Sequence, residues 1–525
     1  MAYVCNKKLV LSVLLVALTC TVDQLVAKDP RIDQQLAQID RVNTNGKWRA
    51  DWDSLTKHEI PEWFRDAKLG IYAHWGVYSV PAFGNEWYPR NMYRKNSSTF
   101  KHHIKTYGGP EKFGYKDFLP RFKAKKFDAE AWAEIYASAG AKFAGPVAEH
   151  HDGVSMWASK VNRWNVAGMG PKRDITKELV EALRKRDIKI IASFHHAFNI
   201  QGYYTRGEGW DTSDPAYTDL YGQFEDKTLA HDRWLIKLKE VIDAYRPDQI
   251  WFDFGLKKIP DEYKQRMAAY YYNHEAKWGK PVIITRKGTH LPEGVGVLDI
   301  ERGKMSGMGK ELWQTDDSVA TNSWCHVNGL KLKPSVELVH ELIDVVSKNG
   351  VLLLNVAPTA DGQIPDDQRK QLLALGNWLK INGEAIYATR PWKFHGEGPN
   401  LFDRGRGLGK IAQQQVGFVA DDIRYTQSKC YKYLYAIALG LPKDSLTLKA
   451  VKINDSGPSA SVTLLGRGKL DFTVNDRKQL VIDTAGLSAS NAPCPFAYSF
   501  KLSGFELDIQ SDAIKKAPKT KMVHD

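Results

Sequence analysis

The central part of the chain alternates short β-branched runs with amphipathic helical patterns, and this alternation constrains the fold more than any other feature. It is typical of βα units and of a parallel sheet. The predicted strands are Leu69–Ala73, Phe143–Ala148, Ile188–Phe194, Gln249–Phe254, Val282–Thr285, Gly296–Ile300, Leu312–Gln314 and Val351–Val356. The predicted helices are Asp128–Ser138, Asp174–Arg186, Leu229–Arg246, Pro334–Lys348 and Asp366–Lys380. The pattern predicts an α/β fold, a (β/α)8-like barrel with insertions, and a doubly wound open sheet is the alternative.

Polar side chains fall at or just after the C-terminal ends of these predicted strands. They are His74, Glu149-His150-His151-Asp152, His195-His196, Asp253, Arg286 and Glu301. In a barrel the C-terminal ends of the strands form one common rim, and active sites are built on that rim. Their placement therefore favours the barrel over the open sheet.

After Pro391-Trp392 the pattern changes to short alternating strands with few helices. The strands are expected at Lys432–Leu439, Ser445–Ile453, Ser461–Leu465, Leu470–Val474, Gln479–Ile482 and Phe496–Leu502. This pattern predicts an antiparallel β-sandwich. We therefore expect a catalytic barrel domain over residues 28–395, a β-sandwich domain over 396–512 and a flexible basic tail over 513–525.

Residues 1–27 have the pattern of a signal peptide. Lys7 and Lys8 precede the apolar run Leu9–Leu18, and Leu25-Val26-Ala27 offers a small-residue cleavage site. The apolar run is too short to span a bilayer. We expect a secreted or periplasmic protein with no membrane contact after cleavage; a single membrane anchor and a lipid attachment at Cys20 are the alternatives.

The composition indicates a soluble globular protein with an excess of positive charge. The 525 residues carry a formal net charge of +13, which suits acidic partners such as nucleic acid, anionic lipid or charged polysaccharide. No recognisable nucleic-acid module accompanies the charge, so no nucleic-acid partner is expected. The 16 Trp, 23 Tyr and 20 Phe suggest aromatic platforms of the kind that bind sugars. The sequence does not give the oligomeric state.

Three of the five cysteines lie beyond the leader, and they show no CxxC spacing. This excludes a zinc ribbon and a dense disulfide framework. One bridge, between Cys430 and Cys494, is left open.

Two carboxylates stand out as catalytic candidates. Asp253 ends an apolar strand flanked by aromatic residues, where a buried carboxylate is costly unless it is paired or used; capping the next helix is its alternative role. Glu301 is the natural second carboxylate, and Asp299 is the alternative because it shares a strand face with Glu301. In glycoside hydrolysis, one carboxylate of such a pair acts as the nucleophile and the other, protonated, acts as the general acid.

Five histidines on the predicted rim resemble a metal cluster: His74, His150, His151, His195 and His196. However, no HExxH occurs, adjacent histidines on an extended segment point to opposite faces, and the two pairs come from different strands. We therefore expect no metal and no cofactor. Neutral imidazoles suit sugar hydroxyls, and Trp residues suit the C–H faces of a sugar. The candidate platforms are Trp75, Trp87, Trp251, Trp313 and Trp324.

Several segments occur in a characteristic order across residues 45–395. They are Trp63-Phe64, Lys68–Gly76, Glu86-Trp87-Tyr88, Glu149-His150-His151-Asp152-Gly153, Gly170–Ile175, Trp251-Phe252-Asp253 and Asn355-Val356-Ala357-Pro358. Together they resemble the α-L-fucosidases of glycoside hydrolase family 29, and residues 422–426 and 435–437 resemble the β-sandwich of that family.

The resemblance implies a retaining exo-α-L-fucosidase that releases terminal fucose from fucosylated oligo- or polysaccharides through a covalent glycosyl-enzyme. It implies that Asp253 is the nucleophile, and the segment Asp299–Gly303 resembles the acid/base segment of the branch that prefers α-1,3/1,4 linkages, which supports Glu301. The positions that match fucose-binding residues are His74, Glu86, Trp87, His150, His151 and Trp251. From the rim we add His195, Arg286 and Trp313 as substrate-binding candidates, with Arg286 bracing the nucleophile region.

The chain departs from the family pattern at Phe254, where a glycine often follows the nucleophile, and this bears on the substrate beyond the first sugar. Basic residues predicted on the rim suggest sulfated fucan as the natural substrate: Lys257, Lys258, Arg286, Lys287, Arg302, Lys304 and Lys310. A generally basic surface is the alternative explanation. Two other functions stay open: a related glycosidase acting on a fucose-like sugar such as an α-L-galactoside, and a non-catalytic fucose-binding protein.

Overall fold

The computed structural model describes residues 30–401 and 417–510. The predicted signal peptide, with Cys5 and Cys20, and the predicted basic tail at 513–525 lie outside the described residues.

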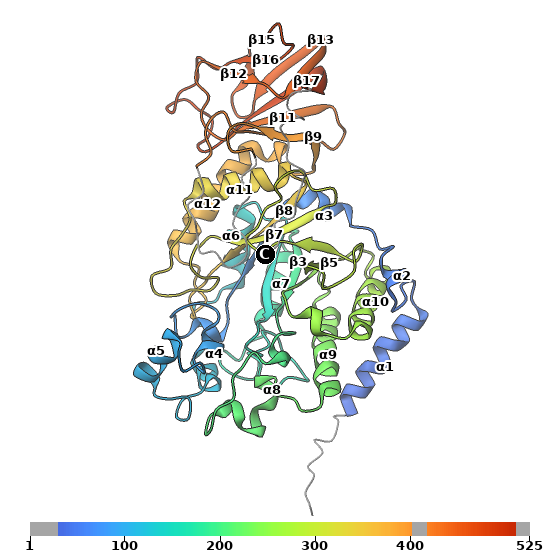
Figure 1. The fold of residues 1–525 in the computed structure, drawn as a ribbon, viewed down its shortest axis with the longest axis vertical. Helices are drawn as coiled ribbons and strands as arrows, with labels where there is room; N and C mark the ends of the chain where they lie inside the picture. The colour runs from blue at the N-terminus through green and yellow to red at the C-terminus, as the bar shows by residue number, and fades with distance from the viewer. Residues whose placement is uncertain (1–29, 402–416, 511–525) are drawn as a thin grey trace, which may run out of the picture.

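A closed barrel of eight parallel strands forms the centre of the molecule (Figure 1). The strands are β1 (Leu69–Ala73), β2 (Phe143–Glu149), β3 (Lys189–Phe194), β4 (Gln249–Phe252), β5 (Ile283–Lys287), β6 (Val297–Asp299), β7 (Trp313–Ser318) and β8 (Gly350–Val356). Each overlaps one predicted strand, so the predicted barrel is confirmed. The open sheet is excluded because β1 pairs with β8 and closes the ring.

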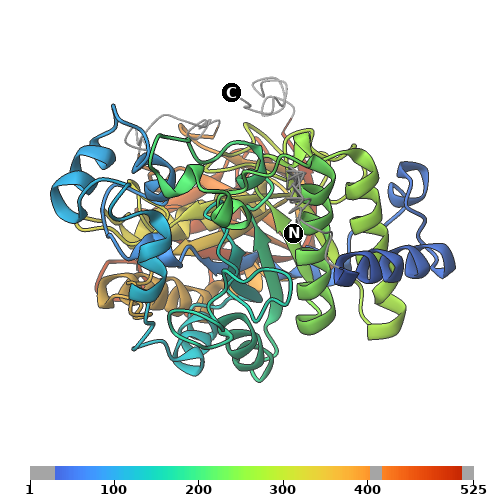
Figure 2. The same cartoon turned by 90° about the horizontal axis from the view of Figure 1, so that it is seen from below.

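Helices surround the barrel, as the view from below shows (Figure 2). The five predicted helices correspond to α6 (Ala129–Ser138), α7 (Ile175–Arg184), α9 (Lys227–Tyr245), α11 (Ser335–Ser347) and α12 (Asp366–Asn382). The other α-helices are α1 (Pro30–Asn45), α2 (Trp52–Leu55), α3 (Glu62–Ala67), α4 (Tyr88–Asn91), α5 (Ser98–Tyr107), α8 (Thr218–Tyr221) and α10 (Asp261–Trp278). Helix α1 packs against α9 and α10 on the outside of the barrel. No helix in the described part of the chain is both long enough and apolar enough to cross a membrane.

Short 3₁₀ helices lie in the connections. They are η1 (Val77–Ser79), η2 (Tyr115–Arg121), η3 (Asn199–Gln201), η4 (Asp211–Ser213), η5 (Pro215–Tyr217), η6 (Leu256–Lys258) and η7 (Gly383–Ala385). The long connections after β1 and β3 and the short η6 after β4 follow the C-terminal ends of the strands. They therefore build the walls above the rim where the polar residues gather.

The C-terminal part forms two antiparallel sheets. The strands are β9 (Thr389–Glu397), β10 (Ile423–Ser428), β11 (Tyr433–Ala438), β12 (Ser445–Leu448), β13 (Val451–Leu464), β14 (Gly468–Leu470), β15 (Phe472–Val474), β16 (Leu480–Asp483) and β17 (Tyr498–Ile509). Six pair in the order β14-β13-β17-β11-β10-β9, and three in the order β12-β16-β15. Buried Tyr425, Leu446, Ile482 and Phe500 belong to one shared core between the two sheets, as expected for a sandwich.

Two details differ from the sequence prediction. The boundary drawn between residues 395 and 396 falls inside β9, which pairs with β10 in the second domain. Cys430 is exposed, Cys494 is buried, and both are free thiols, so the bridge that the sequence left open does not form.

The sandwich packs on α11 and α12 (Figure 1). Buried Arg424 in β10 donates to Asp344 Oδ1 at 2.7 Å, and Lys348 donates to Asp344 Oδ2 at 2.8 Å. The Trp378 indole donates to the Ala497 carbonyl at 2.9 Å. Arg424 and Trp378 therefore make buried hydrogen bonds across the junction, and the two domains pack directly on each other.

Candidate active site

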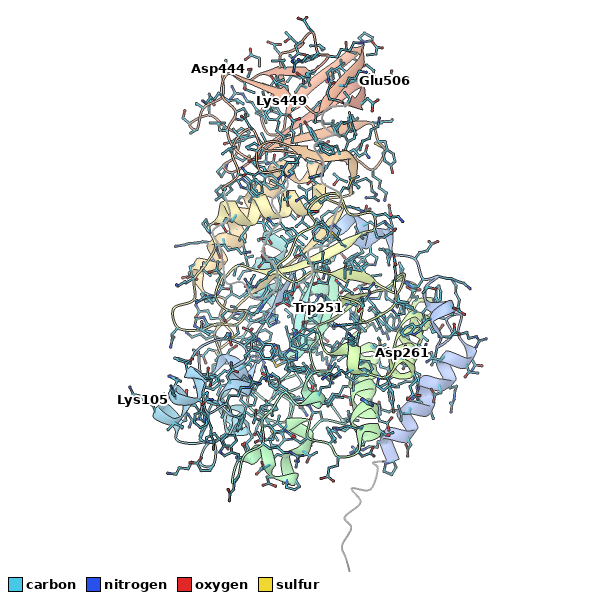
Figure 3. The ribbon with its side chains drawn as sticks, viewed as in Figure 1. Lys105, Trp251, Asp261, Asp444, Lys449 and Glu506 are labelled. Atoms are coloured by element: carbon cyan, nitrogen blue, oxygen red, sulfur yellow. The ribbon has the colours of Figure 1, made fainter. Side chains whose placement is uncertain are left out.

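A polar cavity opens at the C-terminal end of the barrel, around Trp251 at the centre of Figure 3. Its lining residues are His74, Glu86, Trp87, His150, His151, His195, Trp251, Asp253, Phe254, Lys287, Glu301, Asp316 and Trp324. The cavity volume is about 40 Å³, well below the range of about 300 to 1,000 Å³ that is usual for ligand pockets. The structure thus brings together both predicted catalytic carboxylates and seven of the nine predicted substrate-binding residues.

The strands aim these side chains by simple alternation. In β4, Trp251 points into the barrel and its indole N–H donates to Asp299 Oδ2 at 3.0 Å. Asp253 follows the strand directly, and its backbone N–H donates to the Phe194 carbonyl at 3.1 Å. This hydrogen bond continues the ladder with β3 for one more residue, so the Asp253 carboxylate is fixed at the rim.

Asp253 is buried among hydrogen-bond donors. Its Oδ2 lies 3.1 Å from His195 Nδ1 and 3.1 Å from His151 Nε2, and its Oδ1 lies 3.6 Å from Lys287 Nζ. Burial by itself would raise the pKa of Asp253, but the His195 ring, the Lys287 ammonium and the two ring contacts hold it well below its ordinary value. The carboxylate is therefore ionised at neutral pH, as a nucleophile must be.

Lys287 joins the acidic groups of the site. Its Nζ lies 2.9 Å from Glu301 Oε2, 3.1 Å from Asp316 Oδ1 and 3.9 Å from Asp299 Oδ1, in addition to its contact with Asp253. Burial would lower the pKa of Lys287, but the surrounding carboxylates raise it well above its ordinary value. A permanently charged ammonium therefore sits between the two candidate catalytic groups.

Glu301 and Asp299 occupy different environments. Glu301 lines the cavity with 23% of its side chain exposed, and burial, together with Asp316 and Asp253, raises its pKa against the effect of Lys287. Asp299 does not line the cavity, and its Oδ2 accepts from Trp251 Nε1 and from Gln314 Nε2 at 2.5 Å. Burial and Asp316 raise the pKa of Asp299 well above its ordinary value. Glu301 is the group that a substrate can reach.

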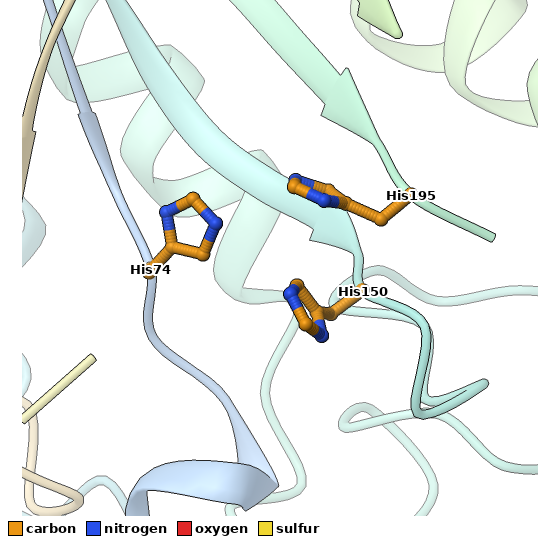
Figure 4. Close-up of side chains that lie close together, drawn as sticks. All are labelled: His74, His150 and His195. Carbon is orange, nitrogen blue, oxygen red and sulfur yellow. The ribbon is translucent and has the colours of Figure 1, made fainter. Parts of the chain in front are cut away.

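Three histidines meet at the centre of the cavity (Figure 4). One ring nitrogen each of His74, His150 and His195 lies within 4.8 Å of the others, and His151, His195 and Asp253 form a second such group. The sequence argument that adjacent histidines diverge is wrong here, because His150 and His151 lie beyond the end of β2, where strand alternation no longer applies.

The rings are suited to neutral hydrogen bonding. Burial lowers the pKa of His74, His150 and His195, so the imidazoles are uncharged at neutral pH. His74 Nδ1 lies 2.9 Å from Asn355 Oδ1, whereas His150 Nδ1 and His195 Nε2 are buried with no protein partner. Such atoms can ligate a divalent cation or bind ligand hydroxyls, since each neutral ring offers one donor and one acceptor.

Aromatic side chains form the walls. The Trp87 ring stacks on Phe254 with a centroid separation of 5.9 Å and an interplanar angle of 19°. Trp324 lies 5.2 Å from the His74 ring, and its backbone N–H donates to Glu86 Oε2 at 3.1 Å. Burial raises the pKa of Glu86. Apolar ring faces beside buried polar groups suit a sugar, which carries C–H surfaces and hydroxyls.

Two predicted substrate-binding residues lie elsewhere. Arg286 turns to the other side of β5 from Lys287, where its guanidinium donates to the carbonyls of Gly288 and Val295. Trp313 packs on the outer side of β7, with its indole donating to the Lys348 carbonyl at 2.9 Å. Successive side chains of a strand point to opposite faces. Lys287 and Gln314 point into the barrel, so their neighbours Arg286 and Trp313 point outward.

The sequence reasoning missed two residues of the site. The sequence predicts Lys287 only as a rim contact for sulfate and not as a partner of the carboxylates, and it gives no role to Asp316. A signal for Asp316 was present, because a pair of aspartates inside a short buried strand is costly unless a cation compensates it.

An ionised carboxylate, a second carboxyl with a raised pKa and sugar-compatible walls at the rim of an eight-stranded barrel define a glycoside hydrolase. The comparison with protein families is specific: residues 35–384 match the family described as alpha-L-fucosidase, and residues 415–503 match the alpha-L-fucosidase C-terminal domain. The chain belongs to the α-L-fucosidase family.

Individual relatives agree with this assignment. Human tissue alpha-L-fucosidase is 30% identical over 476 residues, covering 89% of this chain and 94% of the relative. Human plasma alpha-L-fucosidase is 30% identical and covers 86% of this chain and 91% of the relative. The solved structure of the Thermotoga maritima alpha-fucosidase in complex with fucose superposes with a TM-score of 0.68 at 27% identity, over 87% of this chain and all of that one.

Proposed function

We propose that the protein is a retaining exo-α-L-fucosidase that releases terminal α-L-fucose from fucosylated glycans. The observation that carries the proposal is the pair Asp253 and Glu301, which share one ammonium while their pKa values are displaced in opposite directions. Environments that separate the pKa values of two carboxyl groups assign the nucleophile and the acid.

In the first step Asp253 attacks the anomeric carbon while Glu301 donates its proton to the glycosidic oxygen. The bond from that carbon to the leaving oxygen breaks, and an ester between fucose and Asp253 forms. In the second step Glu301, now a carboxylate, takes a proton from water. The water oxygen attacks the anomeric carbon, and Asp253 leaves as a carboxylate.

The geometry at Lys287 supports retention of configuration. Asp253 Oδ1 and Glu301 Oε2 lie 3.6 and 2.9 Å from the same nitrogen, so their separation cannot exceed the sum of those distances. Inverting enzymes place their two carboxyl groups about 6.5 Å or more apart, whereas retaining enzymes place them roughly 5–5.5 Å apart. The largest possible separation of these two oxygens only equals the lower limit for inverting enzymes, so the geometry favours retention. The small cavity supports cleavage at a terminal sugar, because it leaves little room for a chain on both sides.

The test is Asp253→Gly assayed on an aryl α-L-fucoside, with product stereochemistry followed by NMR on the wild-type enzyme. Turnover by the variant should collapse, azide should restore part of it, and the first product of the wild type should be α-L-fucose. An unchanged rate in Asp253→Gly, or a first product of β configuration, would contradict the mechanism.

We also propose export to a periplasmic or extracellular compartment, supported by the leader pattern at residues 1–27. N-terminal sequencing of protein made in its own host should find a chain that starts close to Lys28. An intact Met1 on the mature protein would contradict this.

Several of the basic residues predicted on the rim do not face the catalytic cavity. Lys287 is engaged with carboxylates, Arg286 turns away from the cavity, and Lys304 is buried. Lys257, Lys258 and Lys310 remain exposed. The seven basic residues therefore do not form one sulfate-binding surface around the cavity. The hypothesis of a sulfated substrate needs a specific binding site for the sulfate group.

A further inference from the structure

A second cavity, distinct from the catalytic one, lies beside the loop that follows the nucleophile. Its volume is about 460 Å³, and four basic side chains line it: Arg206, Lys227, His231 and Lys258. The remaining lining residues are apolar, glycine or glutamine, and none is acidic. We call it the basic cavity. A concave site with one sign of charge attracts and holds an oppositely charged group.

The cationic side chains of the basic cavity are not paired with carboxylates of the described residues, and two of them are hydrogen-bonded to amide and carbonyl oxygens instead. The Arg206 guanidinium donates to Gln223 Oε1 at 2.9 Å and to the Gln223 carbonyl at 3.2 Å, and Lys227 Nζ donates to the Phe224 carbonyl at 2.9 Å. Among the described residues, Arg206, Lys227 and Lys258 have no carboxylate within salt-bridge distance. All three charges therefore remain available to a ligand.

The nearest acids do not cancel this charge. The Asp226 carboxylate caps α9 by accepting from the Thr228 backbone N–H at 2.8 Å. Asp232 and Glu262 lie near His231, but burial and Lys227 together lower the pKa of that ring. His231 is accordingly neutral at neutral pH and can donate one hydrogen bond, while the lysines and the arginine supply the charge.

One layer of residues separates the basic cavity from the catalytic cavity. Gln201, which lines the basic cavity, donates its side-chain N–H to the Gly255 carbonyl at 2.8 Å. Gly255 directly follows Phe254, a wall of the catalytic cavity. Lys258 closes the same short loop at the end of η6. The segment from Phe254 to Lys258 therefore contributes side chains to both cavities.

We propose that the basic cavity binds a sulfate ester carried by the glycan substrate, at a sugar other than the one in the catalytic cavity. The inference rests on the proposed fucosidase function and adds a class of substrate, sulfated fucosyl polysaccharide. A sulfate ester stays anionic at all physiological pH values and presents three acceptor oxygens. The guanidinium, ammonium and imidazole N–H groups that line the basic cavity can donate hydrogen bonds to these oxygens.

The experiment compares one fucosylated oligosaccharide in sulfated and chemically desulfated form, with a neutral aryl α-L-fucoside as reference. The enzymes are the wild type, the double variant Arg206→Gln/Lys258→Gln, and, as the matched control, the double variant Arg477→Gln/Lys478→Gln at two exposed residues outside both cavities. The wild type and the control should prefer the sulfated form in kcat/KM by about tenfold at low ionic strength. The double variant should lose that preference and keep its rate on the aryl fucoside.

The outcomes separate the two proposals. Equal kcat/KM for sulfated and desulfated forms, with normal turnover of the aryl fucoside, overturns the sulfate site alone. A preference that survives in the double variant also overturns it, since the sulfate then binds elsewhere. Absence of turnover on every fucoside overturns the proposed function itself. Added salt should weaken the wild-type preference because charge contacts at an exposed site are screened.

Discussion

Replacing Lys287 by methionine removes the ammonium that lies between the two proposed catalytic carboxyls, Asp253 and Glu301. Methionine has a similar length and keeps the packing, but it leaves Asp253, Glu301 and Asp316 without the charge that lies 2.9–3.6 Å from them. Because Lys287 is only 8% exposed, water cannot take its place without rearrangement. The variant therefore tests whether one buried cation sets the ionisation of the whole site.

The magnitude follows from the distances. Two unit charges 3.6 Å apart attract by about 5 kcal/mol at an effective dielectric constant of about 20. Removing one partner of a buried pair leaves the other charge buried without compensation, and this costs about 3–5 kcal/mol of unfolding free energy. Loss of a preorganised charge beside the reacting groups should also lower kcat/KM at neutral pH by about 100- to 1,000-fold.

The pH profile gives the sharper readout. Asp253 must be ionised and Glu301 protonated for the first step, and Lys287 lowers the pKa of both. Without it both pKa values rise, so the acid limb and the alkaline limb of kcat/KM should both move to higher pH. Lys287→Arg keeps the charge and should leave the limbs near their wild-type positions.

The measurement is kcat/KM on an aryl α-L-fucoside across the pH range, with urea unfolding followed by tryptophan fluorescence. A Lys287→Met enzyme whose two limbs stay where the wild type has them would refute the role given to the ammonium. Unfolding alone cannot mimic the result, since a folded fraction of reduced amount would lower the rate at every pH without moving the limbs.

Other expected outcomes separate catalysis from packing. Glu301→Gln should slow cleavage of a natural glycan by about 10²–10⁴-fold. Asp299→Asn keeps a hydrogen-bond acceptor and should leave the pH profile of kcat/KM unchanged. If Asp299→Asn were the slow variant instead, the acid/base role would belong to Asp299. Trp313→Ala should cost about 3–5 kcal/mol of unfolding free energy in urea and leave KM for the aryl fucoside unchanged. Arg286→Gln should change that KM by no more than about twofold, and a larger rise would return Arg286 to the site. Gly145→Ala should lower the melting temperature sharply, because an added Cβ would lie 1.8 Å from a backbone carbonyl oxygen of the neighbouring strand.

The sequence alone identified the barrel and the sandwich, and it predicted Asp253 and Glu301 as the catalytic pair, because the signals for all three are local. Buried parallel strands appear as short apolar runs, and a carboxylate at the end of such a run, as at Asp253, is costly unless it is used. Helix α10 escaped prediction because its face is built from tyrosines, including Tyr270-Tyr271-Tyr272, which break the usual apolar pattern. Strand β13 was predicted as separate pieces because its register shifts interrupt the alternation.

The tertiary structure alone decided which side of each strand faces the cavity and which distant groups meet. A period of two makes Arg286 and Lys287 opposite but does not say which is inward, and the pairing of β5 with β4 and β6 fixes that choice. Lys287 contacts residues in or just after β4, β6 and β7, and His74, His150 and His195 lie close together; both arrangements depend on closure of the barrel. Closure brings groups far apart in the chain within a few ångströms, where low dielectric makes their charges act on one another. No local pattern in the sequence encodes those distances.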